Sequence, residues 1–528
     1  MNPTSLADRK ALLLSLVIII LLILLCGGMS AYLVSDPTMG QAYALMRAAQ
    51  TIDTRHIDGT TSEQLVRTAR NEMLDLLDRY SGYVTAEEFD QLREEMTGAY
   101  AGLGVSVIRH DLGLLIVSVR RDGPAREAGL EAGDIILAAD SIELAGLRSA
   151  KSTKLLRGED STRVLVRVLK PLSQDTIEVS ITRAEMPLIH VSYAGFTSDS
   201  AIYIRLTNFD AGASEQLKAA IDSLLEQSTF QPTGLILDLR GNPGGLFREA
   251  WESANLFLTE GAFVVGTDAR SRWNSNEIHA LGPDITGDLP LVLLVDRGSA
   301  SSSEILAGAL QQADRAWLVG DTTFGKGLVQ GFVTFPDGDG LRLTISRFYF
   351  DNDVYINEFD TALSEIGHGL PPDYLFDFPE RGEYVRAVEY SLLLHQFARL
   401  HQQDIVSSRG DDQATSALID SLESFMNLEG FVFVSSRREE LSDMLHAARS
   451  DSCTKATDRV ISEALELSVR EDSNLLRLNA AYLTMRLQEI AWEQTYGTYR
   501  TYHEITVPQR ADIRYAESLL RDLLIDNR

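Results

Sequence analysis

The segment PLVLLVDRGSASSSEILAGALQQADRAWLVGD, from Pro290 to Asp321, decides the fold class. Its first apolar run is typical of a buried strand, the stretch SEILAGALQQA is typical of a helix, and AWLVGD returns to a strand pattern. The same alternation continues from about Met186 to Pro379, as in AIYIRL and GLILDL. Buried strands that alternate with helices predict a largely parallel sheet with helices packed on it.

Length and charge limit the function classes. The 528 residues are enough for three or four domains at roughly 150 residues per domain. The 76 acidic and 48 basic residues give a net charge of −28, which would repel nucleic acid and anionic lipid surfaces. Only Cys26 and Cys453 are present, so a disulfide framework is excluded. Because no His/Asp/Glu cluster has ligand spacing, we expect no metal and no cofactor.

The N-terminus carries a long apolar run, ALLLSLVIIILLILLCGGMSAYLV, from Ala11 to Val34. At about 1.5 Å per residue, its 24 uncharged residues can span a bilayer as a helix. Arg9 and Lys10 would keep residues 1–10 in the cytoplasm and leave the remainder outside it, periplasmic or on the cell surface. A cleaved signal peptide is the alternative, with GGMSA as a cleavage site, although the run exceeds the usual 7 to 15 residues or so.

Pattern changes along the chain suggest the domain boundaries. In residues 36–95 the apolar positions recur at helical spacing, as in EQLVRTARNEMLDLLDRY, which predicts a helical N-terminal part. Residues 96–185 consist of short alternating runs such as LLIVSV and RVLVRVL, which predict a small β domain. Residues 186–379 carry the α/β alternation, and residues 380–528 are helical in pattern.

The small β domain contains a glycine-rich turn before a strand, YAGLGVSVI. Such a turn exposes backbone N–H groups that can hold the terminal carboxylate of a peptide. With GPAREAGLEAGDIILAADSIEL and LLRGEDSTRVLVRVL, the region resembles a PDZ domain. The resemblance implies that Gly102, Leu103, Gly104 and Val105 bind the free C-terminus of a protein substrate. The alternative is a small β domain whose glycines only turn the chain.

Four serines cluster where the strand of the opening segment meets its helix: Ser299, Ser301, Ser302 and Ser303. Ser301-x-x-Glu304 matches a capping box, so Ser301 could simply cap the helix. A serine at such a junction is also well placed as a nucleophile, because the helix N-terminus offers free N–H groups to an oxyanion. Glu304 either caps the helix or also holds the site in register.

The base that would activate this serine has to be a residue other than histidine, because the segment around the four serines contains no histidine. Lys326 lies in TTFGKGLV, between two glycines and near Phe324 and Leu328. Only a neutral amine accepts a proton, and burial among apolar groups can lower a lysine pKa by about 3 units. The alternative is a surface lysine in a glycine turn.

The stretch GSASSSEILAGALQQADRAWLVGDTTFGKGLVQ as a whole closely resembles the signature of the C-terminal processing peptidases, also called tail-specific proteases. These are serine endopeptidases with a Ser-Lys pair. The resemblance implies that Ser301 is the nucleophile, Lys326 the base and Gln330 the residue that orients the lysine. In a straight strand, positions 326 and 330 would lie about 13 Å apart, so Gln330 as an ordinary strand residue stays an alternative.

A second segment, GLILDLRGNPGGLFREA, would by itself be a turn after a strand. It resembles the family's Asp-Leu-Arg-x-Asn-Pro-Gly-Gly motif. The resemblance implies an oxyanion hole in which the N–H of Ser302 acts together with the N–H of Gly244 or Gly245. It also implies that Arg240 and Glu304 support the site. The chain departs from the family pattern at Ser302, where alanine is common, and at Gly241, where asparagine is frequent.

The sequence therefore predicts a multidomain α/β protein: a transmembrane helix, a PDZ-like domain, a ClpP/crotonase-like catalytic domain and a helical C-terminal extension. The resemblance implies a membrane-anchored serine endopeptidase that cleaves proteins near their C-terminal ends outside the cytoplasm. An inactive peptide-binding scaffold is the alternative; an esterase lacks its Gly-x-Ser-x-Gly motif here. The C-terminal helices carry no recognisable motif. They could mediate homo-oligomerisation, dock a partner, or simply shield the catalytic domain.

Overall fold

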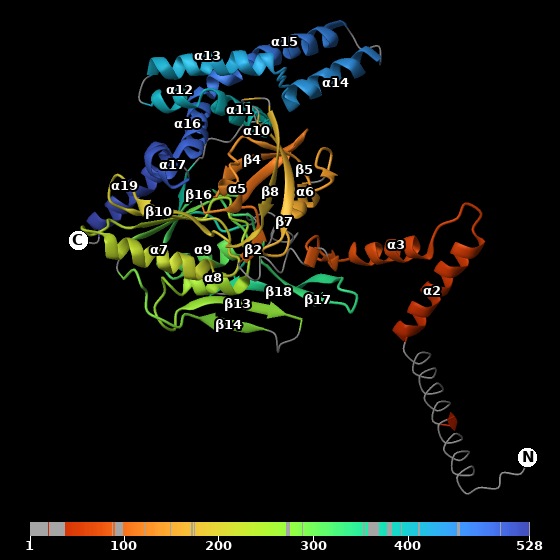
Figure 1. Ribbon diagram of the computed structural model, residues 1–528. Coiled ribbons are helices and arrows are strands. Elements are labelled where there is room, and N and C mark those ends of the chain that lie inside the picture. The colour runs from red at the N-terminus through yellow and green to blue at the C-terminus, as the bar shows by residue number, and fades with distance from the viewer. Residues whose placement is uncertain are drawn as a thin grey trace, which may run out of the picture. The chain divides into compact units, whose positions relative to one another are not determined.

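The computed structural model (Figure 1) describes part of the chain. The predicted membrane segment 11–34 lies outside the described residues, apart from Ile19 and Ile20. Within the described ranges, no helix combines the length and apolar character needed to span a bilayer. Two compact units are present, one from Met1–Glu87 with Gln330–Thr344 and one from Glu88–Val329 with Ile345–Arg528. The described residues are 19–20, 37–86, 88–89, 99–120, 122–147, 149–170, 173, 175–270, 275–287, 289–351, 354–356, 369–376, 383–391, 393–409, 412–450, 455–496 and 498–526.

The first unit combines two helices with a small antiparallel sheet. Its second helix begins with a capping box, in which the Gln64 N–H donates to Thr61 Oγ1 and the Thr61 N–H donates to Gln64 Oε1, both at 3.2 Å. After that helix, Asp78 accepts hydrogen bonds from the N–H groups of Tyr80 and Ser81. The predicted helical N-terminal part therefore turns here and ends in a strand. The elements are α2 (Pro37–Arg55), α3 (Ser62–Leu74), β1 (Gly82–Val84), and parts of β17 (Leu328–Thr334) and β18 (Gly340–Phe350).

The small β domain is an antiparallel sheet in the order β3-β4-β5-β7-β8. Along β7, Val164, Val166 and Val168 alternate with more exposed residues and all enter one core, as the period of two in a strand requires. Outside this sheet, β2 pairs antiparallel with β9, and Gly102 lies opposite Ala184. The elements are β2 (Ala99–Gly102), β3 (Val105–His110), β4 (Gly113–Val119), α5 (Pro124–Glu127), β5 (Ile135–Ala139), β6 (Ile142–Glu143), α6 (Ser149–Leu156), β7 (Arg163–Lys170), β8 (Asp175–Thr182) and β9 (Ala184–Pro187).

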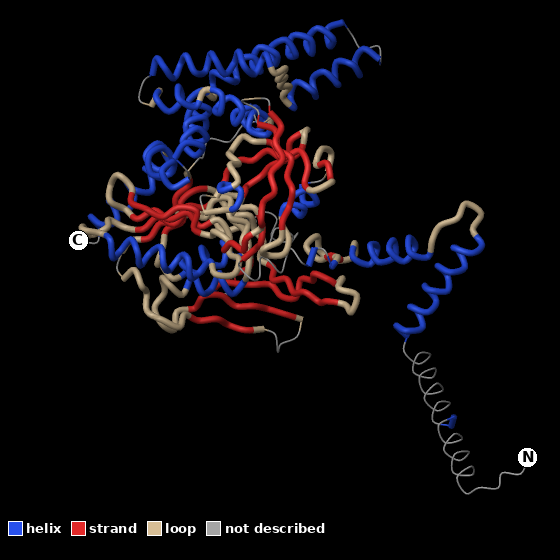
Figure 2. The backbone as a smooth tube through the Cα atoms, in the orientation of Figure 1, coloured by secondary structure: helices blue, strands red, loops and turns tan. Residues whose placement is uncertain are grey.

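The main sheet has the order β10-β11-β12-β15-β16-β20, and every pair except β10 with β11 is parallel. On β12, Leu235 and Leu237 face the core under α7, α8 and α9, whereas Ile236 faces a second core under α19. Helices therefore cover both faces, which explains why these strands are apolar throughout and confirms the predicted parallel sheet (Figure 2). The elements are β10 (Val191–Phe196), β11 (Ile202–Leu206), α7 (Ala213–Gln227), β12 (Leu235–Asp238), α8 (Phe247–Ala254), β15 (Leu291–Val295), α9 (Ser302–Gln312), β16 (Trp317–Gly320) and β20 (Tyr374–Leu375), with β13 (Phe263–Ala269), β14 (Asn276–His279), β19 (Val354–Tyr355) and part of β18 in a second sheet.

The described residues from 383 to 526 are mainly helical, as their sequence pattern predicts. Most of these helices share a core of their own, which includes Phe397, Leu422 and Leu487. The last helix is different, because Ile513 and Leu520 pack on the main sheet. The helices are α10 (Glu383–Tyr390), α11 (Leu393–Leu400), α12 (Gln402–Ser407), α13 (Asp412–Leu428), α14 (Ser436–Ser450), α15 (Lys455–Leu478), α16 (Ala480–Tyr496), α17 (Thr498–Thr501), a π-helical turn (Tyr502–Thr506), α18 (Val507–Gln509) and α19 (Ala511–Asp526).

Candidate active site

Ser301 lies at the junction between β15 and α9, one residue before the helix begins. Its backbone has φ 54° and ψ −109°, a conformation that residues other than glycine rarely adopt and that costs roughly 1–3 kcal/mol. The side chain is half-buried. A strained serine at the N-terminus of a helix fits the geometry expected for a nucleophile at this junction.

The other three serines of the cluster use their hydroxyl groups to hold the neighbouring loop. Each donates a hydrogen bond to a backbone carbonyl between residues 239 and 246. The bonds are Ser299 to Leu239 at 2.9 Å, Ser302 to Gly245 at 3.1 Å with Leu246 at 3.3 Å, and Ser303 to Asn242 at 2.9 Å. These three hydroxyls are therefore committed to holding the loop, and Ser301 stays the predicted nucleophile.

Glu304 is fully buried, and its carboxylate accepts four hydrogen bonds. Oε2 accepts from the backbone N–H of Ser301 at 2.8 Å and from that of Lys326 at 2.9 Å. Oε1 accepts from the N–H of Gly325 at 2.7 Å and from Thr323 Oγ1 at 2.6 Å. Burial raises the pKa of the Glu304 carboxyl above its ordinary value, while these hydrogen bonds oppose the rise. Glu304 thus both caps α9 and ties the serine turn to the lysine loop.

Lys326 follows β16 in the loop that leads to β17, and its side chain is half-buried. Of the two neighbours expected to exclude water, Leu328 is 7% exposed, whereas Phe324 is 37% exposed. The Phe324 N–H donates to the Ser299 carbonyl at 3.0 Å, which holds the loop against the serine cluster. The structure therefore brings the backbones of Ser301 and Lys326 together.

The loop after β12 contains Gly244 and Gly245, either of which was expected to donate to an oxyanion. Gly244 has φ +99°, and a Cβ there would lie 2.9 Å from both Ser301 Cβ and Ser302 N. Its N–H is already used, since it donates to Asn242 Oδ1 at 3.0 Å. Among the described residues, no hydrogen bond uses the N–H of Gly245 or that of Ser302. The geometry therefore favours Gly245 over Gly244 as the partner of Ser302.

Asn242 connects this loop to the elements on both sides of it, although no role was assigned to it from the sequence. Its Nδ2 donates to the Leu206 carbonyl on β11 at 3.0 Å. Its own carbonyl accepts from the Ala300 N–H at 3.0 Å, directly before the proposed nucleophile. The asparagine in RGNPGG was the available sequence signal, but its partners depend on the tertiary fold.

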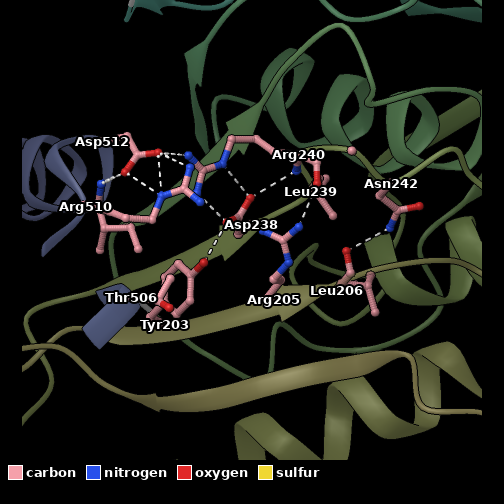
Figure 3. Close-up of polar contacts among 12 residues, drawn as sticks. Tyr203, Arg205, Leu206, Asp238, Leu239, Arg240, Asn242, Thr506, Arg510 and Asp512 are labelled. Carbon is pink, nitrogen blue, oxygen red and sulfur yellow. Dashed lines mark hydrogen bonds and ion pairs between the residues drawn. The ribbon is translucent and has the colours of Figure 1, made fainter. Parts of the chain in front are cut away.

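Arg240 lies at the start of the same loop and is buried with Asp238 at the end of β12 (Figure 3). Arg240 Nε donates to Asp238 Oδ1 at 2.8 Å and Nη2 donates to Oδ2 at 2.5 Å, while Tyr203 donates to Oδ2 at 2.6 Å. Burial opposes ionisation of Asp238, but the charge and hydrogen bonds of Arg240, with the charge of Arg205, hold the pKa of that carboxyl well below its usual range. Arg240 therefore holds the end of β12 through Asp238, and its supporting role in catalysis stays a prediction.

Gln330 lies on β17 in the first compact unit. Its Nε2 donates to the Tyr80 carbonyl at 2.8 Å, and Arg342 Nε donates to the same carbonyl, also at 2.8 Å. Among the described residues, the Gln330 side-chain amide has this bond to Tyr80 as its hydrogen bond. Orientation of Lys326 by Gln330 stays a prediction.

The four residues assigned to substrate C-termini join β2 to β3 in the small β domain. Gly102, Leu103 and Gly104 are buried, and Gly104 has φ +75°. The Leu103 carbonyl accepts from the Ala125 N–H at 2.9 Å, and the Gly104 carbonyl accepts from the Arg120 N–H at 2.8 Å. Val105 begins β3, which pairs with β4 on one side and with no other described strand. Its free edge can accept an added strand.

Taken together, the site offers a serine hydroxyl, a lysine amine and two N–H groups that are unbonded within the described part of the chain. Such a set can attack a carbonyl, move a proton and stabilise an oxyanion. In the same ranges, no three or more His, Cys, Asp or Glu side chains gather as a metal-ligand set.

Comparison with known proteins identifies two regions of the chain. Residues 200–374 match Peptidase family S41, and residues 101–182 match the PDZ domain family. The first match contains Ser301 and Lys326, and the second contains the Gly102–Val105 segment.

Curated relatives extend the likeness beyond these regions. A Bartonella bacilliformis protein named Carboxy-terminal-processing protease is 31% identical over 63% of this chain and 74% of the relative. A Synechocystis protein named Carboxyl-terminal-processing protease is 36% identical over 53% and 66% of the two chains. The Bacillus subtilis Carboxy-terminal processing protease CtpA is 31% identical over 60% of this chain and 66% of the relative. The chain therefore belongs to the carboxy-terminal processing proteases of peptidase family S41, and it is a serine protease with a PDZ domain.

Proposed function

We propose that the protein is an endopeptidase that hydrolyses peptide bonds near the C-termini of protein substrates with a Ser301-Lys326 dyad. The observation that carries the proposal is the Glu304 carboxylate, which accepts from the backbone N–H groups of both residues. This shared acceptor sets the serine turn and the lysine loop side by side. The intact pair argues against the alternative of an inactive peptide-binding scaffold.

The dyad works by proton transfer in two half-reactions. Ser301 Oγ attacks the scissile carbonyl carbon while its proton moves to neutral Lys326 Nζ. The tetrahedral intermediate collapses with cleavage of the C–N bond, and Lys326 returns the proton to the leaving amine. A water molecule, deprotonated by Lys326, then attacks the ester carbonyl carbon. The ester C–O bond breaks, the carboxylic acid product leaves, and Lys326 returns the proton to Ser301 Oγ.

The N–H groups of Ser302 and Gly245 stabilise the oxyanion of both intermediates. Ser302 is the first residue of α9, so its N–H belongs to the positive end of the helix. The Gly244 backbone lies against Ser302 N, which supports the assignment of the next N–H along the loop. Gly244 itself shapes the loop through its bond to Asn242.

The PDZ domain recognises the substrate C-terminus. The peptide adds a strand to the free edge of β3, and its carboxylate binds backbone N–H groups of the Gly102–Val105 segment. α6 packs near β3 and would border the bound peptide. The carbonyls of Leu103 and Gly104 are fixed by hydrogen bonds, so the segment is already shaped before a ligand arrives.

The protease acts outside the cytoplasm, anchored by residues 11–34. The apolar length of this segment and the preceding Arg9 and Lys10 support this orientation. Protease added to intact spheroplasts should degrade the catalytic domain, whereas protection until the cells are lysed would contradict the orientation.

The decisive experiment is cleavage of an unstructured protein by the purified full chain beside Ser301→Ala and Lys326→Ala. Both variants should lose activity by several orders of magnitude while keeping the wild-type melting temperature. Lys218→Ala is the matched control, because Lys218 is an exposed lysine paired with Asp222 on α7. Full activity in either dyad variant would refute the proposed mechanism.

A further inference from the structure

The C-terminal segment of the chain is packed into the catalytic domain. α19 covers the face of the main sheet opposite α7, α8 and α9, with Ile513 and Leu520 against Ile236 and Leu294. Because β12 leads directly into the loop that carries Gly245, α19 lies beneath the strand that supports the proposed oxyanion hole. The contact is not apolar throughout, and its polar part lies at the start of α19.

Asp512, the second residue of α19, is 4% exposed and meets two arginines (Figure 3). Its Oδ2 forms an ion pair with Arg240 Nη1 and accepts from Arg510 Nη2 at 2.7 Å. Its Oδ1 accepts from the Ile513 N–H at 2.8 Å. Asp512 is therefore held in place on α19 while it binds the guanidinium of Arg240.

Arg240 consequently joins two carboxylates from distant parts of the chain. Its Nε and Nη2 atoms donate hydrogen bonds to Asp238 on β12, and its Nη1 atom forms an ion pair with Asp512 on α19. Arg205 adds a third guanidinium, with Nη1 at 3.3 Å from Asp238 Oδ2. Without Asp512, Arg205 and Arg240 would share Asp238, and Arg510 would lose its ion-pair partner and keep only the more distant charges of Asp238 and Glu489. Asp512 thus compensates positive charge that would otherwise push Arg240 from its place.

We propose that Asp512 is a positioning residue for peptide-bond hydrolysis. It holds the Arg240 guanidinium, and through it the start of the loop that ends in the Gly245 N–H. The inference rests on the proposed function, because it requires an oxyanion on the reaction path. It gives the last helix a part in catalysis, beyond the shielding or oligomerisation expected of the C-terminal extension.

The test compares kcat and KM for Asp512→Asn and for the double variant Asp512→Asn/Arg510→Gln in the full chain. The double variant removes one charge of each sign, so the cluster keeps its net charge. It also leaves no Arg510 guanidinium without its Asp512 partner. Both variants should lose about tenfold or more in kcat with KM within about twofold, because loop displacement weakens transition-state binding.

A second readout separates positioning from stability. A substrate-like peptide aldehyde forms a hemiacetal with Ser301, and its oxygen occupies the oxyanion position. Its affinity should fall by the same factor as kcat, while substrate KM barely changes. The matched control is Arg521→Gln, which breaks an exposed ion pair between α19 and Asp199, 3.0 Å long, and should leave both values unchanged.

The outcomes distinguish this inference from the proposed function. Activity in a parallel Ser301→Ala sample would refute the dyad itself. Wild-type kcat and aldehyde affinity in a folded double variant, beside an inactive Ser301→Ala, would overturn only the role of Asp512. If Asp512→Asn alone fails to fold, the double variant decides the question.

Discussion

The backbone N–H groups of Ser301 and Lys326 donate to the same oxygen, Oε2 of Glu304, at 2.8 and 2.9 Å. The two residues lie on different loops, one before α9 and one after β16. A single buried carboxylate therefore sets their separation. The helix that begins after Ser301 therefore also fixes the backbone of the loop that carries Lys326, the proposed base.

Glu304→Gln should separate these loops. An amide side chain has one acceptor oxygen, and its NH2 group would face donors, so two of the four hydrogen bonds have no acceptor. We expect kcat to fall by about 100-fold and the free energy of unfolding to drop by about 2–4 kcal/mol. Cleavage kinetics and urea denaturation measure the two effects. Glu215→Gln, at an exposed position of α7, is the control, and wild-type kcat in folded Glu304→Gln would contradict the prediction.

Lys326→Arg should be inactive, although the approximate length and basic character of the side chain are kept. A guanidinium stays protonated at any pH at which the protein is folded, so it cannot accept the Ser301 proton. The residual rate should equal that of Ser301→Ala in the same assay. Lys218→Arg should keep full activity, and a working Lys326→Arg enzyme would show that another group is the base.

Ser302→Ala tests the Ser302 hydroxyl, at the position beside Ser301 where the resemblance implies that alanine is common. Ser302 Oγ donates to the Gly245 carbonyl at 3.1 Å, and this bond fixes the residue whose N–H we assign to the oxyanion hole. Its loss should lower kcat several-fold and cost about 1 kcal/mol of unfolding free energy, with little change in KM. Steady-state kinetics decide the point. An unchanged kcat would mean that the loop holds its shape without this hydroxyl.

Substrates with amidated C-termini should be cut more slowly than the same substrates with free carboxylates. The amide removes the charge that the N–H groups near Gly104 are proposed to bind, so KM should rise while kcat stays within about twofold. Paired peptides that differ only at the terminus provide the comparison. Equal KM values would argue against recognition of the tail by the PDZ domain.

His395 on α11 should make the stability of the protein depend on pH. Its Nδ1 atom is buried without a hydrogen-bond partner in the described part of the chain. Burial and the charge of Arg486 lower the pKa of His395 to about 4, from an unfolded value near 6.5. Between these values the unfolded state takes up a proton that the folded state does not. The unfolding free energy should therefore fall as pH drops through this window, by about 3 kcal/mol from this group.

The His395→Gln variant isolates that contribution from the carboxyl groups that titrate in the same range. Urea denaturation of both proteins at pH 7 and pH 4 gives the two differences. The variant should lose less stability than the wild type on acidification. Equal losses would mean that His395 is protonated in the folded state as easily as in the unfolded one.

Local patterns predicted much of the fold. The apolar runs at 291–295 and 316–320 indicated buried parallel strands because both faces of the sheet are covered. The spacing of Ser301 and Glu304 indicated a helix start, which the structure confirms. These features depend on neighbouring residues, so they can be read without the tertiary structure.

Other features depend on contacts that no local pattern encodes. The sequence left Gly244 and Gly245 as equal candidates, because the choice depends on where the Asn242 side chain points. Nothing in the periodicity of α19 indicates which surface it covers. The partnership of Asp512 with Arg240 likewise follows from packing, since Asp512 resembles any acidic residue in a first helical turn.

The pairing of β2 with β9 has a consequence for how the PDZ domain could be inserted or lost during evolution. Gly102 and Ala184 face each other across that pair, so the chain enters and leaves the PDZ domain at one place. A domain joined to the rest of the chain by two paired strands can be gained, lost or exchanged without changing the path of the chain through the catalytic domain. Closing the gap between Gly102 and Ala184 with a short turn would turn the two strands into an ordinary hairpin.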